Sequence, residues 1–381
     1  MNEQRYAVAA AAIFDGALVR DDYVVIVEGA SIAALVRRRD MPAGLTVHEL
    51  PHGAWLAPGF IDVQVNGGGD ALFNNEPTPE GIAKIAAAHR RFGTTGILPT
   101  LITDSDDKMR AARAAADAAR QTLPGVLGIH FEGPFLSPEK CGVHDPSLMR
   151  APNPSHRDVF NGHPGVTLVT LAPERVPDGF IRSLAGAGVR VSLGHSMATY
   201  EQTRIAIADG LTGFTHLFNA MRPLAAREPG PIAAALESPG CWYGLIIDGI
   251  HVAPPMLRLA LKGAGAPMLV TDAMPNVGGV KKSFTLYGSE IIVEGQRVTM
   301  KDGTLAGSGI DMASAVRNCV KLLGVPLADA LRFASRAPAE FLGVGNRYGR
   351  IAPGYRADMV ALDPSDIRVL GTYLSGAYES S

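Results

Sequence analysis

Hydrophobic and polar positions follow one pattern at the two ends of the chain and another in its middle. At the ends, short apolar or β-branched runs are separated by turns such as Asp15-Gly16 and Glu28-Gly29, a pattern typical of antiparallel strands. The runs cover residues 7–14, 24–28, 45–50, 359–362 and 368–373. Neither end is long enough to bury a core alone, so we expect residues 1–57 and 345–381 to form one small β-sandwich domain.

The middle of the chain, residues 58–344, alternates short apolar runs with helical patterns at 80–92, 105–122, 201–209 and 256–263. This alternation predicts parallel β/α units. Eight runs qualify as strands: 60–65, 96–101, 126–131, 166–171, 189–193, 213–217, 243–247 and 268–271. Eight units close a TIM-like (β/α)8 barrel, so the predicted fold class is α/β.

Residues 283–303 interrupt the barrel pattern. Two alternating runs, 284–287 and 291–300, are broken by Gly288 and by Glu294-Gly295. They predict a β-hairpin inserted after the eighth strand. The hairpin could cover a site as a lid or serve a purely structural role at an edge, and the sequence leaves both readings open.

Composition and charge limit the kinds of partner that we expect the protein to bind. The 381 residues carry a formal net charge of −2, which gives no basic field for nucleic acid or an anionic membrane. The apolar runs are shorter than the about 20 residues of a membrane helix. Cys141, Cys241 and Cys319 are far apart and show no CxxC spacing, which favours a reducing compartment. We therefore expect a cytoplasmic protein without nucleic-acid or membrane partners.

Polar side chains stand at the carboxyl ends of the predicted strands, where barrel enzymes build their active sites. In chain order these are Gln64 and Asn66, Thr100 and Thr103, Glu132, Glu174, His195, His216, Asp248 with His251, and Asp272. Glu132, His195 and His216 supply one carboxylate and two imidazoles, a ligand set typical of a catalytic zinc site with an open fourth position. The alternative for each histidine is a buried structural role.

Other residues near these ends could take part in the chemistry. Asp272 follows an apolar strand and could pass a proton from water to a leaving amine, or simply cap a helix. His251 could donate a hydrogen bond to a carbonyl or a substrate hydroxyl, or be structural. His130 lies two residues before Glu132, so it faces the same side of the strand and could be a ligand or support one.

Two further segments could contact a phosphorylated ligand. Arg227, in the turn Arg-Glu-Pro-Gly, could hold a phosphate with two parallel hydrogen bonds, or be a surface arginine. The glycine-rich segment 303–309 could bring backbone amides close to a ligand. No GxGxxG after a strand, Walker loop or nucleophile elbow occurs, so nucleotide binding and serine hydrolysis lack support.

Seven segments together resemble the N-acetylglucosamine-6-phosphate deacetylases of the amidohydrolase superfamily. They are Pro58–Gly67, His130–Phe135, Gly194–Ser196, Thr215–Met221, Arg227–Gly230, Asp248–His251 and Val270–Ala273. The combination of His-Leu-Phe-Asn-Ala-Met with Arg-Glu-Pro-Gly is the most specific part. The resemblance implies metal-dependent hydrolysis of N-acetylglucosamine 6-phosphate to glucosamine 6-phosphate and acetate.

The resemblance also implies roles for individual residues. It implies metal ligands at Glu132, His195 and His216, and catalytic roles for Asp272 and His251. The implied substrate contacts are Val143, Asn219, Ala220, Arg227, His251, Leu305, Ala306 and Gly307. It further implies a homodimer in which Arg227 meets the phosphate across the interface.

One departure from the superfamily pattern bears on the metal count. Many amidohydrolases carry His-x-His after the first strand as ligands to a second metal, whereas this chain has Gln64-Val65-Asn66. Amides are poor zinc ligands beside imidazole and carboxylate. We therefore expect one divalent ion, zinc, with Gln64 and Asn66 at vestigial second-metal positions.

Three alternative functions remain at this level. The substrate could be N-acetylgalactosamine 6-phosphate, since the epimers differ at one hydroxyl. The chain could be another amidohydrolase, such as a nucleobase deaminase or a cyclic-amide hydrolase, because a fold does not fix a function. It could also be a non-catalytic barrel that acts as a binding module, although a silent barrel would be expected to lose the ligands or the base.

Overall fold

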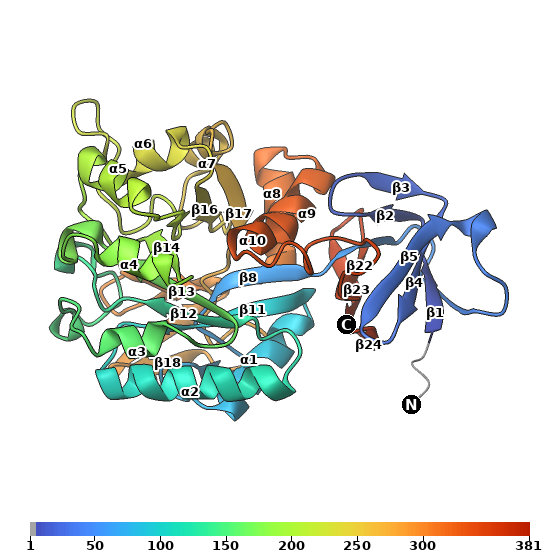
Figure 1. Ribbon diagram of the computed structural model, residues 1–381, viewed down its shortest axis with the longest axis horizontal. Helices are drawn as coiled ribbons and strands as arrows, with labels where there is room; N and C mark the ends of the chain where they lie inside the picture. Colours follow the sequence, from blue (N-terminus) through green and yellow to red (C-terminus); the bar gives the residue numbers. More distant parts are fainter. Residues whose placement is uncertain (1–4) are drawn as a thin grey trace. The chain divides into compact units, whose positions relative to one another are not determined.

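The computed structural model describes residues 5–381, which form two compact units (Figure 1). One unit comprises residues 5–62, 89–96 and 311–381, and the other comprises residues 63–88 and 97–310. The predicted domain limits at 57/58 and 344/345 stay a prediction. Within residues 5–381, no helix has both the length and the apolar character that crossing a membrane requires.

Eight parallel strands form the central sheet, which confirms the predicted (β/α)8 class. In sheet order they are β8 (Phe60–Val65), β11 (Thr94–Ile102), β12 (Gly128–Glu132), β13 (Val166–Leu171), β14 (Arg190–Leu193), β15 (Gly213–Phe214), β16 (Trp242–Leu245) and β17 (Ala266–Leu269). A parallel bridge between Val65 and Ala273 links the first strand to the segment after the last. The sheet thus curls into a nearly closed barrel whose strand ends meet at one rim.

Helices follow the barrel strands in turn. They are α1 (Pro79–Arg90), α2 (Asp106–Thr122), α3 (His156–Phe160), α4 (Phe180–Gly186), α5 (Tyr200–Ala208), α6 (Gly230–Glu237) and α7 (Pro254–Ala260). Local sequence explains where they begin. The Thr199 side chain accepts a hydrogen bond from the backbone of Gln202, and the Gln202 side chain accepts one from the Thr199 backbone amide, so a capping box starts α5. At the start of α2, the Ser105 side chain accepts a hydrogen bond from the backbone of Lys108.

The inserted segment is larger than the predicted hairpin. It forms a four-stranded antiparallel sheet of β18 (Ser283–Leu286), β19 (Ser289–Glu294), β20 (Arg297–Thr299) and β21 (Leu305–Ser308). The difference arises because the run 291–300 forms two strands, β19 and β20, on either side of Gly295, and because Leu305–Ser308, within the segment we expected to be a glycine-rich loop, pairs with β20. Apolar side chains of this sheet pack with Leu72, Ile102 and Met274 in one buried cluster. Two short strands, β9 (Gly67–Gly68) and β10 (Ala71–Leu72), lie after β8.

Strands from both chain ends pair in the other unit, as predicted. A six-stranded sheet has the order β24-β23-β22-β7-β2-β3, and a four-stranded sheet has the order β5-β4-β1-β6. Their bounds are β1 (Arg5–Ala9), β2 (Ala12–Phe14), β3 (Val19–Asp21), β4 (Tyr23–Glu28), β5 (Ser31–Arg37), β6 (Thr46–Glu49), β7 (Trp55–Pro58), β22 (Met359–Asp363), β23 (Arg368–Leu374) and β24 (Ala377–Ser380). Val8 and Val25 of one sheet share a buried core with Ile13, Leu56 and Tyr373 of the other.

Two details of this unit differ from the prediction. The apolar run 7–14 is split into β1 and β2, and the pairs β1–β6 and β2–β7 are parallel rather than antiparallel. The split lets one run contribute a strand to each sheet, and a strand that changes sheets can take a parallel neighbour. The unit also contains α8 (Met312–Leu323), α9 (Leu327–Ala334) and α10 (Arg336–Phe341).

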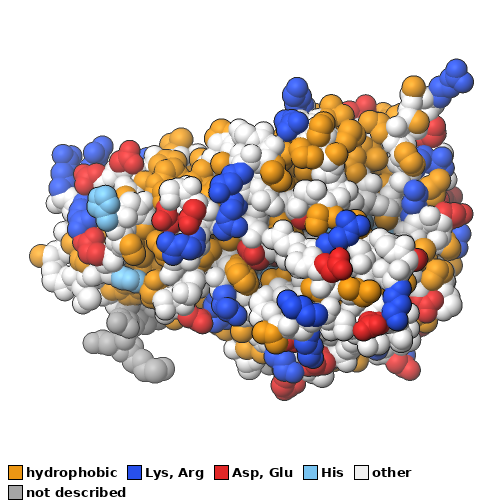
Figure 2. Space-filling view, turned by 180° about the vertical axis from the view of Figure 1, so that it is seen from behind, with side chains coloured by type: hydrophobic (Ala, Val, Ile, Leu, Met, Phe, Trp, Pro, Cys, Tyr) orange, Lys and Arg blue, Asp and Glu red, His pale blue; other side chains and the backbone are white. Residues whose placement is uncertain are grey.

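The distribution of charged side chains on the surface agrees with the small net charge of the chain. Figure 2 shows basic and acidic side chains interspersed over one face of the molecule. Cys141, Cys241 and Cys319 are free thiols in this structure.

Candidate active site

Strand register brings the predicted metal ligands to one level of the barrel rim. Leu193 of β14 pairs with Phe214 of β15, and His195 and His216 each follow two residues later. Glu132 is the last residue of β12. All three side chains are buried, with relative exposures of 2–5%. The rule that barrel sites form at strand ends therefore holds for this trio.

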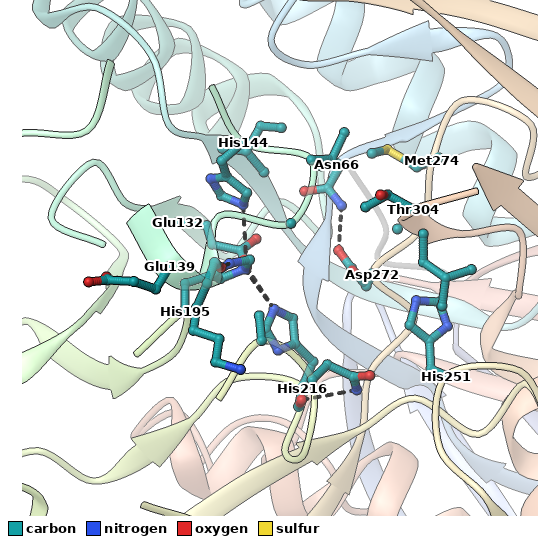
Figure 3. Close-up of a pocket in the computed structure, with 18 residues that line it drawn as sticks. Asn66, Glu132, Glu139, His144, His195, His216, His251, Asp272, Met274 and Thr304 are labelled. Carbon is teal, nitrogen blue, oxygen red and sulfur yellow. Dashed lines mark hydrogen bonds and ion pairs between the residues drawn. The ribbon is translucent and has the colours of Figure 1, made fainter. Parts of the chain in front are cut away.

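The three side chains converge on one point (Figure 3). Nε2 of His195 and Nε2 of His216 each lie 3.0 Å from Oε1 of Glu132 and 3.1 Å from each other. Tetrahedral ligands with bonds of about 2.0–2.1 Å lie about 3.3 Å apart, so these separations are close to those of a metal site. Nδ1 of His195 bonds to the Lys140 carbonyl at 2.7 Å, which leaves the Nε2 lone pair for a metal.

Electrostatics at this point favour a cation. Burial alone would raise the pKa of Glu132, but hydrogen bonds and charge interactions with His195 and His216 outweigh it and lower that pKa well below its usual range. The pKa of His216 is raised despite its burial, because the Glu132 carboxylate accepts its hydrogen bond. The carboxylate is thus ionised, and it faces two imidazoles that suit a divalent metal.

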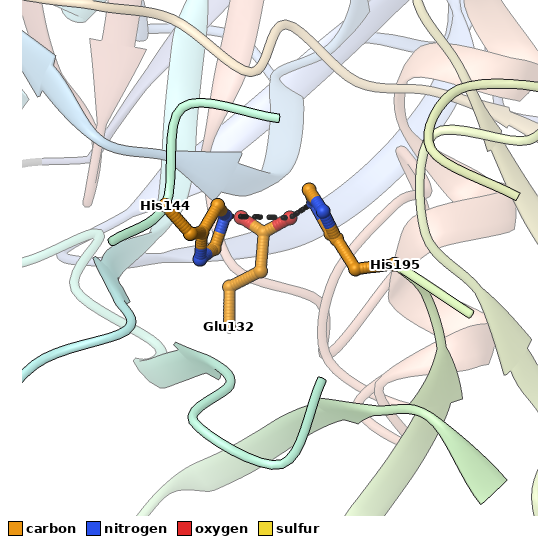
Figure 4. A group of neighbouring side chains, drawn as sticks. All are labelled: Glu132, His144 and His195. Atoms are coloured by element: carbon orange, nitrogen blue, oxygen red, sulfur yellow. Dashed lines mark hydrogen bonds and ion pairs between the residues drawn. The ribbon is translucent and has the colours of Figure 1, made fainter. Parts of the chain in front are cut away.

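A third histidine, His144, also reaches this cluster. Its Nε2 lies 4.0 Å from Oε1 of Glu132, its ring centroid is 4.3 Å from that of His195, and its Nδ1 bonds to Thr103 Oγ1 at 2.8 Å. Figure 4 shows the rings of His144 and His195 on either side of the carboxylate. Glu132, His144 and His195 have ligand atoms close enough together to hold a metal. Sequence reasoning missed His144 because it lies in a loop rather than at a strand end.

Asp272 faces the amides of Gln64 and Asn66. Its Oδ1 accepts hydrogen bonds from Asn66 Nδ2 at 2.6 Å and from Gln64 Nε2 at 3.2 Å. The Gln64 amide also lies 3.1 Å from Oε2 of Glu132. Burial, together with the charge of Glu132, raises the pKa of Asp272 to about 6, which suits a group that must take and release a proton near neutral pH.

His251 and His130, the other two histidines considered in the sequence analysis, have different hydrogen-bond partners from the proposed metal ligands. Nδ1 of His251 lies 2.6 Å from the Asp248 carboxylate, and this contact fixes the ring and leaves Nε2 available. His130 bonds to Thr100 and Thr170 inside the barrel, at 3.3 and 2.7 Å. Burial lowers the pKa of His130 to about 4, so the ring is neutral. The side-chain hydrogen bonds of His130 thus go to two threonines. A metal ligand, or a residue that supports Glu132 directly, would instead contact the Glu132 carboxylate.

Backbone strain is concentrated at the same residues. His195, His216 and Asp272 have φ values of 48°, 33° and 53°, and Ala220 has 49°. Residues other than glycine rarely adopt this left-handed backbone conformation, which costs of order 1–3 kcal/mol at each position. The fold therefore holds these residues in conformations that aim their side chains at the site.

A cavity of about 350 Å³ contains these groups. Of the expected substrate contacts, the residues lining it are Val143, Asn219, Ala220, His251, Leu305 and Gly307. Arg227 is exposed and lies outside the lining. Ala306 also lies outside it, because its side chain is fully buried in the core beneath the inserted sheet. Lining residues that sequence reasoning did not single out include Ile102, Glu139, Lys140, His144 and Met274.

Comparisons with known proteins point to one family. The sequence model of the amidohydrolase family matches residues 55–378. The chain is 44% identical over 325 residues to N-acetylgalactosamine-6-phosphate deacetylase of Shewanella sp. (strain ANA-3), which covers 84% of this chain and 82% of the relative. It is 33% identical over 384 residues to N-acetylglucosamine-6-phosphate deacetylase of Haemophilus influenzae, with coverage of 99% and 100%. A crystal structure of N-acetylglucosamine-6-phosphate deacetylase from Pasteurella multocida superposes with a TM-score of 0.94 at 35% identity, covering 99% of this chain and 100% of that one.

Proposed function

The chain belongs to the N-acetylglucosamine-6-phosphate deacetylase family of the amidohydrolases, and from this premise we propose that it hydrolyses the N-acetyl group of an amino sugar 6-phosphate. The substrate we propose first is N-acetylglucosamine 6-phosphate, with glucosamine 6-phosphate and acetate as products. The observation that carries the proposal is the convergence of Glu132, His195 and His216 beside Asp272 in one buried cavity. The N-acetylgalactosamine epimer is the second candidate, because relatives named for it include one that is 44% identical.

We propose one zinc ion as the cofactor, held by Glu132, His195 and His216. These ligand atoms are mutually 3.0–3.1 Å apart, whereas His144 stands 4.0 Å from the carboxylate. A divalent ion bound there would polarise the acyl carbonyl and lower the pKa of water. The amides of Gln64 and Asn66 point their donors at Asp272, which supports the absence of a second metal.

The chain's own residues supply the proton transfers and the orientation. Asp272 takes a proton from the attacking water and delivers it to the amine nitrogen as the C–N bond breaks. Oδ1 is occupied by the two amides, so Oδ2 is the oxygen that carries the proton. His251, oriented by Asp248, offers Nε2 to the substrate or to the developing oxyanion.

The phosphate contacts that we propose come both from the cavity wall and from outside the cavity. We propose that Asn219 and the Ala220 backbone contact the substrate from one protomer, and that Arg227 reaches the phosphate from the partner in a homodimer. The exposure of Arg227 and its place outside the cavity lining support an intermolecular role. We also propose a cytoplasmic location, in keeping with three free thiols.

Acetate release tests the proposal directly. The metal-loaded protein is assayed with N-acetylglucosamine 6-phosphate, N-acetylgalactosamine 6-phosphate and the two unphosphorylated sugars. We expect release from a phosphorylated sugar at least about tenfold faster than from its unphosphorylated form, because a charge-assisted phosphate contact is lost in the latter. The ratio between the epimers decides the substrate. No release from any of the four would favour another amidohydrolase substrate or a non-catalytic barrel.

A further inference from the structure

A second cavity of about 460 Å³ adjoins the active-site cavity. Gly142, Val143, His144 and Thr304 line both cavities. The second cavity lies between the loop at 141–146 and the inserted sheet, which contributes Leu286, Tyr287, Ser289, Ile291 and Met300. The roles proposed above do not use this space.

The walls of the second cavity include several apolar side chains that a short acyl chain could contact. Leu286 and Ile291 belong to the buried core of the inserted sheet, and the partly buried Val143 and Met300 pack against that core. Three polar side chains in the cavity already have partners within the chain. The Tyr287 hydroxyl donates to the Thr103 carbonyl, the Asp145 carboxylate accepts from Ser147, and the Asp302 carboxylate accepts from the Thr304 amide.

The lining of the active-site cavity is mixed in chemistry. Asn219 and His251 contribute polar groups, whereas Ile102, Val143 and Met274 contribute apolar ones. Figure 3 shows His144, Met274 and Thr304 on one side of Asp272, and His216 and His251 on the other. A sugar phosphate needs polar contacts, so we infer that the acyl group of the scissile amide lies beside the apolar lining residues, next to the residues shared with the second cavity.

We propose that the second cavity receives acyl chains longer than acetyl, so that the protein also hydrolyses N-propionyl and N-butyryl amino sugar 6-phosphates. The inference rests on the proposed deacetylase function. In the reaction the water oxygen bonds to the acyl carbonyl carbon and the C–N bond breaks. The electron pair stays on nitrogen, which receives the proton through Asp272, and the products are the free amino sugar phosphate and propionate or butyrate.

The experiment compares kcat/KM for the N-acetyl, N-propionyl and N-butyryl forms of the preferred sugar phosphate. We expect the butyryl form to stay within about tenfold of the acetyl form, whereas a pocket closed around a methyl group loses about 10–200-fold for one misfit methylene. No cleavage of any form would reject the proposed function itself. Cleavage of the acetyl form with loss of more than about 100-fold on the butyryl form would reject only the acyl cavity.

A cavity-filling variant tests the location. Met300→Trp should lower kcat/KM for the butyryl form at least about tenfold and change the acetyl form less than about twofold, because added bulk in a packed space excludes the chain end. Thr285→Trp is the matched control, since Thr285 is exposed on the same sheet and does not line the cavity. If Met300→Trp also loses acetyl cleavage, Ser289→Trp, at another position that lines the cavity, takes its place. Equal butyryl cleavage in the filled and control variants overturns the assignment.

Discussion

The side-chain amide of Asn66 donates a hydrogen bond of 2.6 Å to Oδ1 of Asp272. Asn66 occupies a position where many amidohydrolases carry a metal-binding histidine, and here it holds the carboxylate that we propose as the base. The contact opposes the burial and the Glu132 charge that raise the pKa of Asp272 to about 6. The amide therefore both orients the carboxylate and favours its ionised form.

Replacing Asn66 should move the pH profile. A base must be deprotonated to act, so kcat/KM of the wild type should fall as the pH drops through about 6. Asn66→Ala removes a hydrogen bond to the ionised form, which raises the pKa of Asp272 and shifts this acidic limb upward by about one pH unit. Asn75→Ala is the control, since Asn75 is exposed and bonds to the Thr285 carbonyl instead. If the acidic limb of the kcat/KM pH profile is unshifted in Asn66→Ala, Asn66 does not tune the pKa of Asp272 in this way.

Asp272→Asn should abolish turnover without loss of the metal. The amide cannot accept and return the proton, and general acid–base catalysis is worth about 10²–10⁴-fold in kcat. The metal content, measured by elemental analysis, should stay at the wild-type level because Glu132, His195 and His216 are intact. A fully active Asp272→Asn protein would falsify the assignment of the base.

Substitutions of the proposed metal ligands should lower both the metal affinity and the activity. His195→Ala and Glu132→Gln each remove one of three proposed ligands, so metal affinity should fall at least about 100-fold. Titration of the chelated protein with zinc measures this loss. His52→Ala serves as the control, because His52 is exposed at a turn of the terminal domain. Retention of wild-type zinc affinity by both ligand variants would place the ion elsewhere.

The double substitution Gln64→His with Asn66→His should create a second metal site. Both amides already lie 2.6–3.2 Å from Oδ1 of Asp272, and Gln64 is 3.1 Å from Glu132. Two imidazoles at these positions would face two carboxylates, a donor set that suits zinc. Elemental analysis should rise from about one to about two divalent ions per chain. An unchanged ratio would argue that the barrel rim leaves no room for a second ion.

Mixing two impaired variants tests the role of Arg227 between protomers. Arg227→Ala should raise KM for the phosphorylated sugar, and Asp272→Asn should abolish kcat. In a heterodimer, one of the two sites combines an intact Asp272 with the intact Arg227 of the other chain. A one-to-one mixture refolded or co-expressed should therefore recover about a quarter of wild-type activity at low substrate, by the statistics of a two-fold symmetric dimer. Absence of any recovery would mean that Arg227 does not act across an interface.

Much of this architecture could be predicted from the sequence because it depends on local patterns. The alternation of apolar runs and helical patterns predicted the eight barrel strands, and turn dipeptides predicted the terminal β domain. The helical patterns 105–122 and 201–209 correspond to α2 and α5, whose starts are capped by Ser105 and Thr199. The placement of Glu132, His195 and His216 at one rim followed from the same rule, since parallel strands in a barrel end at one edge.

Other features depended on contacts between distant residues, and only the tertiary structure decided them. His144 joins the metal cluster from a loop, so no strand pattern marks it. Leu305–Ser308 pairs as a fourth strand of the inserted sheet, which buries Ala306, and Arg227 stays exposed outside the cavity. Local sequence determines periodicity, turns and the order of chemical groups along the chain. Distances, burial and the raised pKa of Asp272 arise only when strands far apart in sequence close the barrel, because electrostatic interactions and desolvation depend on position in space.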